Sequence, residues 1–173
     1  CLGNNQYEIT MVVYRDCAGI NVDPSVTLQL QSPCGNTSLV VSTPGGVEIS
    51  QLCDLELPNS TCNGGSLPGI QQYIYTGTIT LAPCDSWTIS YTNIYRNNAI
   101  VNLQNPGTQR TYIRAVVNTT VNPCNDSPQF SNTAIPFVCL GYPITYSFGA
   151  FDTEGDSLSY VLIDAMGING API

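Results

Sequence analysis

The sequence predicts an all-β fold, an antiparallel β-sandwich stabilised by disulfides. In several segments apolar residues recur at every second position, which is the pattern of a strand with one buried face. Helical periodicity is nearly absent, and eight cysteines are scattered through turn-rich sequence. At 173 residues with 43% hydrophobic content, the chain is long enough for one full domain, or for one domain and part of another.

Five segments show this alternation clearly, and each is expected to be a strand with its apolar side chains on one face. In chain order, those side chains are Tyr7, Ile9, Met11 and Val13; Val26, Leu28 and Leu30; Tyr73, Tyr75, Ile79 and Leu81; Trp87, Ile89 and Tyr91; and Ile113, Ala115 and Val117. Residues 143–148 and 157–163 show the same pattern later in the chain. We expect these two to be the first strands of a second β-domain.

Turn residues at 82–86 predict a hairpin between two consecutive strands. In the expected register Leu81 pairs with Trp87, which sets Gly77 opposite Tyr91. An aromatic ring lying over a strand glycine is a known device for stabilising a sheet.

A second predicted hairpin, around residues 43–46, leads to a disulfide. Pairing Val40 with Val47 would bring Cys34 and Cys53 together beyond the strand ends. The sequence therefore predicts a Cys34–Cys53 disulfide, with Cys53–Cys62 as the competing pair.

The cysteine inventory indicates disulfides rather than a metal site. The eight cysteines form an even set with no C-x-x-C pair, and the chain has no histidine. This favours an oxidising, extracytoplasmic compartment over the alternative of buried thiols in a cytosolic domain. Cys1 and Cys17 cannot pair, because the extended strand between them holds them too far apart. Cys124 and Cys139 flank a Pro- and Ser-bearing stretch and could bridge a joint between domains.

We therefore expect two domains: a sandwich over residues 1–127, and the first strands of a second, truncated β-domain over 128–173. The chain starts at Cys1 and carries no signal-peptide pattern and no apolar run near the ~20 residues that cross a membrane. These features predict a mature or excised portion of a longer secreted protein, with no direct membrane insertion.

The polar composition excludes several kinds of chemistry. Without His there is no imidazole base for a nucleophile, and without Lys there is no Schiff base or phosphate-loop lysine. A net charge of −8, with four separated arginines, argues against nucleic acid and anionic membrane surfaces as partners. We expect no enzymatic activity, although paired carboxylates do serve glycosidases.

The acidic stretch from Asp152 to Tyr160 has two competing interpretations. Residues 155–158, Gly-Asp-Ser-Leu, match the nucleophile signature of a hydrolase, but that interpretation lacks a histidine and a downstream domain. Alternatively, Asp152, Glu154 and Asp156 surround a glycine turn with oxygen ligands of the kind that Ca²⁺ prefers. A plain solvated turn, with Gly155 supplying positive φ, explains the same residues.

Several motifs resemble those of one family. They are the run from Asn5 to Gly19, Cys84–Tyr91 with residues 95–97, Ser127–Ser131, and Gly149–Tyr160. Together they are similar to the gliding-motility-associated, adhesin-like surface proteins of Bacteroidetes, which are built from tandem immunoglobulin-like, PKD-like and cadherin-like domains. The resemblance implies an immunoglobulin-like sandwich followed by a cadherin-like domain, export to the cell surface, and a role in adhesion, motility or filament structure.

The resemblance also implies that Asp152, Glu154 and Asp156 are calcium ligands at the start of the cadherin-like domain, although no cofactor is required for the sandwich. The expected partners are neighbouring domains or copies of the chain in a fibre or surface array. The alternative function is a carbohydrate-binding module of a larger secreted protein. For that alternative the predicted ligand contacts are Tyr95, Arg96 and Asn97, which follow a strand end.

Overall fold

The computed structural model describes residues 1–93, 96–98, 100–121, 123–131, 141, 143, 145–147 and 149–173. The described chain is all-β, which confirms the predicted fold class. The strands are β1 (Gln6–Asp16), β2 (Ser25–Ser32), β3 (Gly35–Ser42), β4 (Gly46–Glu48), β5 (Ile70–Thr80), β6 (Trp87–Asn93), β7 (Thr111–Val117), β8 (Gln129–Phe130) and β9 (Ala150–Phe151). The described residues also form four 3₁₀ turns: η1 (Leu57–Asn59), η2 (Thr61–Asn63), η3 (Pro106–Thr108) and η4 (Ile168–Gly170).

Seven strands form one antiparallel sheet in the order β1-β5-β3-β2-β6-β7, with β4 added beside β5. β1 and β5 pair along their whole length, from Gln6 opposite Thr80 to Asp16 opposite Ile70. β2 pairs with β3 as a hairpin and with β6 over a short stretch. One residue pair, Ser42 with Thr76, connects β3 to β5. The sheet therefore bends at this weak junction.

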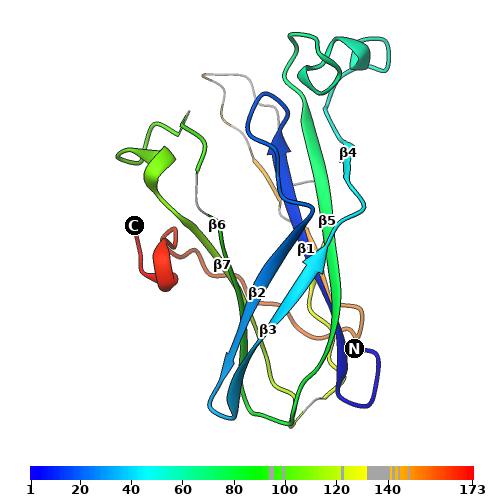
Figure 1. Ribbon diagram of the computed structural model, residues 1–173, viewed down its shortest axis with the longest axis vertical. Coiled ribbons are helices and arrows are strands. Elements are labelled where there is room, and N and C mark those ends of the chain that lie inside the picture. The colour runs from blue at the N-terminus through cyan, green and yellow to red at the C-terminus, as the bar shows by residue number, and fades with distance from the viewer. Residues whose placement is uncertain are drawn as a thin grey trace.

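The bend lets the sheet curl over its own apolar face. In Figure 1, β1, β4 and β5 lie on one side, β6 and β7 on the other, and β2 and β3 run between them. Side chains from both sides meet in one core, which accounts for the two-layer character of the fold. The buried hydrophobic residues are Tyr7, Met11, Leu28, Leu30, Val41, Tyr75, Leu81, Cys84, Trp87 and Ile89.

The predicted hairpin around residues 82–86 is wrong. β5 pairs with β1 rather than β6, so Gly77 lies opposite Ile9 and not opposite Tyr91. The glycine has a different purpose, because a Cβ there would come within 2.9 Å of Val41 Cγ1 and 3.0 Å of the Val40 carbonyl oxygen. Gly77 thus permits the close approach of β3 to β5 at the bend.

The predicted hairpin around residues 43–46 is also wrong, and so is the Cys34–Cys53 disulfide that was predicted from it. β4 pairs with β5, where Val47 lies opposite Gln72. Cys34 lies in the turn after β2 and is bonded to Cys84, in the loop before β6. Because β2 and β6 are neighbours, that turn and that loop end up side by side.

The other two disulfides also differ from the predicted pairs. Cys17 bonds Cys62, since the full-length pairing of β1 with β5 brings the segments beyond their ends together. Cys124 bonds Cys1, whereas the prediction paired it with Cys139. Cys139 lies outside the described residues. Among the described residues Cys53 is an exposed free thiol. The separate partners of Cys1 and Cys17 confirm that these two do not pair with each other.

The region after residue 127 has little regular structure. β8 and β9 form a two-stranded sheet of their own. The strand expected over 157–163 is absent, although all of those residues are described. Of the segment 143–148, residues 144 and 148 lie outside the described part and the others are not in strands. The boundary between 1–127 and 128–173 stays a prediction, as do the immunoglobulin-like and cadherin-like assignments.

Candidate functional site

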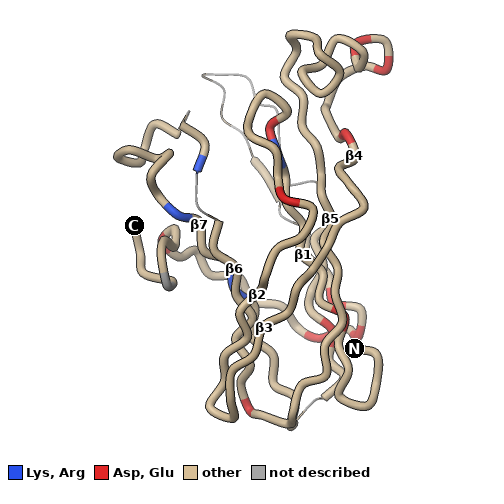
Figure 2. Tube along the Cα trace, viewed as in Figure 1, with Lys and Arg blue, Asp and Glu red and all other residues tan. Residues whose placement is uncertain are grey.

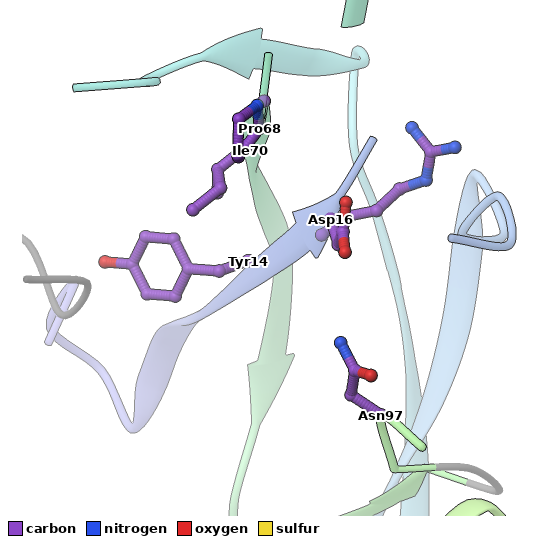
Figure 3. A pocket seen from close by; sticks show the side chains of 7 residues that line it. Tyr14, Asp16, Pro68, Ile70 and Asn97 are labelled. Carbon is purple, nitrogen blue, oxygen red and sulfur yellow. The ribbon is translucent and has the colours of Figure 1, made fainter. Parts of the chain in front are cut away.

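A hollow of about 280 Å³ lies where β1 ends and β5 begins. Tyr14 and Asp16 line it from β1, Pro68 and Gly69 from the segment before β5, Ile70 from the start of β5, and Asn97 from the segment after β6. Figure 3 shows the Asn97 amide pointing toward the end of β1, and the Tyr14 ring projecting on the other side of the strand end. The residues that line the hollow thus include an aromatic ring on one side of the strand end, and a carboxylate and an amide at and beyond the other side.

Arg15 also lines the hollow, but its guanidinium is committed to holding the neighbouring loop. It donates to the carbonyl oxygens of Ile20 at 2.8 Å, Gly19 at 3.0 Å and Cys17 at 3.3 Å. It also donates to Gln71 Oε1 at 2.9 Å. Together with the Cys17–Cys62 disulfide, these bonds fix the wall of the hollow, and Arg15 acts as a structural residue.

Asp16 shapes the same loop through both its side chain and its backbone. Its Oδ1 accepts the Ala18 amide hydrogen at 2.9 Å, and its carbonyl accepts the Gly19 amide hydrogen at 2.9 Å. One carboxylate oxygen is thus used within the loop. The exposed carboxylate keeps further acceptor capacity toward the hollow.

The three predicted ligand contacts have separate outcomes. Tyr95 lies outside the described residues. Arg96 donates to the carbonyl oxygen of Arg110, just before β7, at 3.2 Å and to that of Met166, in the C-terminal segment, at 2.9 Å. Asn97 lines the hollow. The sequence analysis did not single out Tyr14 and Asp16. They lie at a strand end, three residues and one residue before Cys17.

Three tyrosines elsewhere, Tyr7, Tyr75 and Tyr91, lie in the core or pack against it rather than forming an aromatic platform. Burial raises the pKa of Tyr7, Tyr75 and Tyr91 above the ordinary value, with nearby charge adding to the effect at Tyr75 and Tyr91. The Tyr75 hydroxyl donates to the Asp23 carbonyl at 2.6 Å, and the Tyr7 hydroxyl donates to the Pro123 carbonyl at 2.5 Å. These hydroxyls tie loops to the sandwich.

The acidic turn at 152–156 is organised by its own backbone. Asp152 Oδ1 accepts the amide hydrogens of Glu154 and Asp156, both at 3.0 Å, and Gly155 has φ of +84°. This geometry matches the plain-turn interpretation. Among the described residues, no three His, Cys, Asp or Glu side chains gather as a group that could hold a metal ion. Calcium binding at Asp152, Glu154 and Asp156 stays a prediction.

A second acid, Glu48, organises the long loop between β4 and β5. Its carboxylate accepts from Ser50 Oγ at 2.7 Å and from Asn63 Nδ2 at 2.8 Å. Hydrogen bonds from Ser60, Ser50 and Asn63 hold the pKa of Glu48 below its ordinary value against the opposing effect of burial. Sequence reasoning missed this residue because its partners lie up to 15 positions away.

Comparison with known proteins gives no match to a family model, a curated protein or a solved structure. No helix in the part of the chain that the structure describes is long and apolar enough to cross a membrane.

Proposed function

We propose that this chain is a non-enzymatic structural or adhesive module of a secreted surface adhesin or extracellular filament. The observation that carries the proposal is the Cys1–Cys124 disulfide, which closes the sandwich region into one covalent loop with a sequence separation of 123. Both ends of this region are therefore fixed at one place.

The other two disulfides extend the same design. Cys34–Cys84 and Cys17–Cys62 link loops at the ends of neighbouring strands, so the β2–β6 and β1–β5 pairings are each closed covalently. Disulfides of this kind favour the folded state by restricting the unfolded chain. Such resistance to unfolding suits a protein that must last outside the cell.

The three disulfides among the described residues indicate an oxidising, extracellular environment. Placement at a bacterial cell surface, with neighbouring domains or further copies of the chain as partners, is part of the proposal. The proposed function requires no cofactor.

The proposal can be tested with beads coated with the oxidised protein. We expect these beads to attach to one another or to protein- and glycan-coated surfaces more than beads carrying reduced, alkylated protein do. Attachment equal to that of uncoated beads, on every surface and between beads, would overturn the proposal.

The hollow at Tyr14, Asp16 and Asn97 favours a second candidate function, carbohydrate binding. Sugars are commonly bound by an aromatic face together with carboxylate and amide groups, and these three residues supply those groups. On a glycan array we expect saturable binding to one glycan class that Tyr14→Ala abolishes. Tyr160→Ala, which alters an exposed tyrosine outside the hollow, should leave binding unchanged. Binding insensitive to Tyr14→Ala would contradict this candidate.

A further inference from the structure

The loop between β1 and β2 contains the only Asp-Pro peptide bond in the sequence, Asp23–Pro24. A bond of this kind is chemically weak, because the aspartyl carboxyl can attack its own carbonyl carbon and the proline nitrogen accepts a proton more readily than other amide nitrogens. Both residues are exposed, so water and protons reach the bond. The loop is therefore a place where the backbone can be cut without an enzyme acting on it.

The Asp23 carboxyl is free to make this attack. Among the described residues, none forms a hydrogen bond or an ion pair with it. Figure 2 shows acidic residues at the two ends of the loop that joins β1 to β2, which itself contains no basic residue. Asp16, at the other end of this loop, differs from Asp23, since its Oδ1 accepts the Ala18 amide hydrogen at 2.9 Å.

The carbonyl that would be attacked already accepts a hydrogen bond from a buried side chain. Tyr75 in β5 is 1% exposed, and its hydroxyl donates to the Asp23 carbonyl oxygen at 2.6 Å. Attack on the carbonyl carbon moves negative charge onto this oxygen, so a donor already in place stabilises the tetrahedral intermediate. Burial raises the pKa of Tyr75, with smaller contributions from Tyr91, Tyr73 and Asp23, so the hydroxyl keeps the proton that it donates.

We propose that Asp23–Pro24 is a self-cleavage site, in which the Tyr75 hydroxyl stabilises the reacting carbonyl. The carboxyl oxygen of Asp23 forms a bond to the Asp23 carbonyl carbon, and the bond from that carbon to the Pro24 nitrogen breaks. The electron pair of the broken bond stays on the nitrogen, which takes up the proton that the carboxyl gives up. Water then opens the cyclic anhydride left on Asp23. The net reaction is hydrolysis of one peptide bond, with nothing oxidised or reduced.

The disulfides keep the molecule in one piece after this cut. Residues 1–23 contain two cysteines, and the partners of both lie on the other side of the cut, in the bonds Cys1–Cys124 and Cys17–Cys62. β1 is also paired with β5 along its full length. After cleavage β1 is therefore a separate peptide, held by two disulfides and by the sheet.

Cleavage changes what these two disulfides do. In the intact chain they cross-link a continuous backbone, whereas in the cleaved chain they are the covalent connection between β1 and the other strands. Reduction would then release β1 from its covalent attachment. Self-cleavage goes beyond the proposed structural function and does not depend on it, since bead attachment tests adhesion separately.

The cut can be followed by mass spectrometry of the oxidised, folded protein kept for several days in mildly acidic buffer. We expect the intact mass to rise by one water, and subsequent reduction to release residues 1–23 and a fragment that begins at Pro24. Asp23→Ala should abolish the cut, because it removes the attacking carboxyl. A folded chain that stays uncut, or a cut that persists in Asp23→Ala, would overturn the proposal.

Tyr75→Phe isolates the contribution of the hydroxyl, since the ring stays in the core. It should slow the cut about tenfold or more. Tyr7→Phe is the matched control, because it removes another tyrosine hydroxyl that donates to a loop carbonyl, that of Pro123, and should leave the rate unchanged. Equal rates in Tyr75→Phe and the native chain would mean that the bond has only the ordinary lability of Asp-Pro, and the proposal would be wrong.

The native chain unfolded in urea gives a comparison that does not depend on whether Tyr75→Phe folds. Unfolding removes the Tyr75 hydrogen bond but leaves the Asp23–Pro24 bond itself unchanged. We expect the folded chain to be cut about tenfold faster or more than the unfolded one in the same acidic buffer. An unfolded chain that is cut as fast as the folded one would contradict any contribution from the fold.

Discussion

The sandwich region, residues 1–127, and the region that follows it contain similar strand-like sequences but use them differently. Leu30 in β2 is 0% exposed, whereas Leu162 is 100% exposed. β1 finds β5 as a partner along its full length, while the 157–163 segment finds none. Three disulfides lie in the first region, and none links the described residues of the second. Alternation therefore produces a strand only where a partner is in reach.

The two leucines offer the largest contrast. Leu30→Ala should reduce the free energy of unfolding by about 2–5 kcal/mol, because it removes a fully buried side chain and leaves a cavity. Leu162→Ala, measured in dilute protein, should change it by less than about 0.5 kcal/mol. Chemical denaturation gives both values. Equal losses would show that the C-terminal segment is packed in solution.

The disulfides should come next in size. Replacing both Cys34 and Cys84 with Ser should cost about 2–4 kcal/mol, given the sequence separation of 50 that the bond closes. Cys53→Ser is the control, since this exposed thiol is free among the described residues. Thermal melting of both variants under oxidising conditions measures the difference. A melt of the double variant that coincides with that of Cys53→Ser would refute the structural importance of this bond.

Removal of residues 128–173 should have a smaller effect. The described hydrogen bonds from this region to β7 and its flank include those of Met166 with Tyr112 and Arg96. Their loss should cost about 1 kcal/mol and lower Tm by a few degrees, with unfolding still cooperative. A shortened chain that no longer melts cooperatively would show that the two regions form a single unit.

The smallest effect is expected at Glu48 and should depend on pH. The pKa of Glu48 is lowered in the folded chain, so its stabilisation of the loop is present above the ordinary carboxyl pKa and is lost as pH falls through the lowered value. Glu48→Gln should therefore speed hydrogen exchange of the 49–69 amides at neutral pH, and differ less from the native chain in acid. A difference that grows in acid would contradict this sign.

The sequence predicted local properties well and long-range pairing poorly. Alternation identified the inward faces of β1, β2, β5 and β6, since each depends only on nearby residues. The face predicted for β7 is wrong, because Ile113 is 46% exposed and Ala115 is exposed as well. It could not say that β5 pairs with β1 across more than 50 residues rather than with β6. The Cys34–Cys53 prediction assumed a local hairpin and failed with it. The exclusion of a Cys1–Cys17 bond depended on the length of one strand, and it holds.

The same limit applies to the candidate site. Asn97 was predicted as a ligand contact because it follows a strand end, and it does line the hollow. Arg96 has the same sequence context but binds the Met166 carbonyl, a partner 70 positions away. Tyr14 and Asp16 become neighbours of Asn97 only through tertiary folding, and no spacing in the sequence indicates this.

The Cys1–Cys124 bond also determines how the chain would carry tension. Its Cα atoms are 5.1 Å apart, so a pull between the N-terminus and residue 124 passes through sulfur and not through the sheet. The bond closes a span of 123 residues, which cannot be stretched while the bond is intact. Fully extended, this span would measure on the order of 400 Å. Chemical reduction would release that length, which makes extensibility a property set by the redox state of the surroundings.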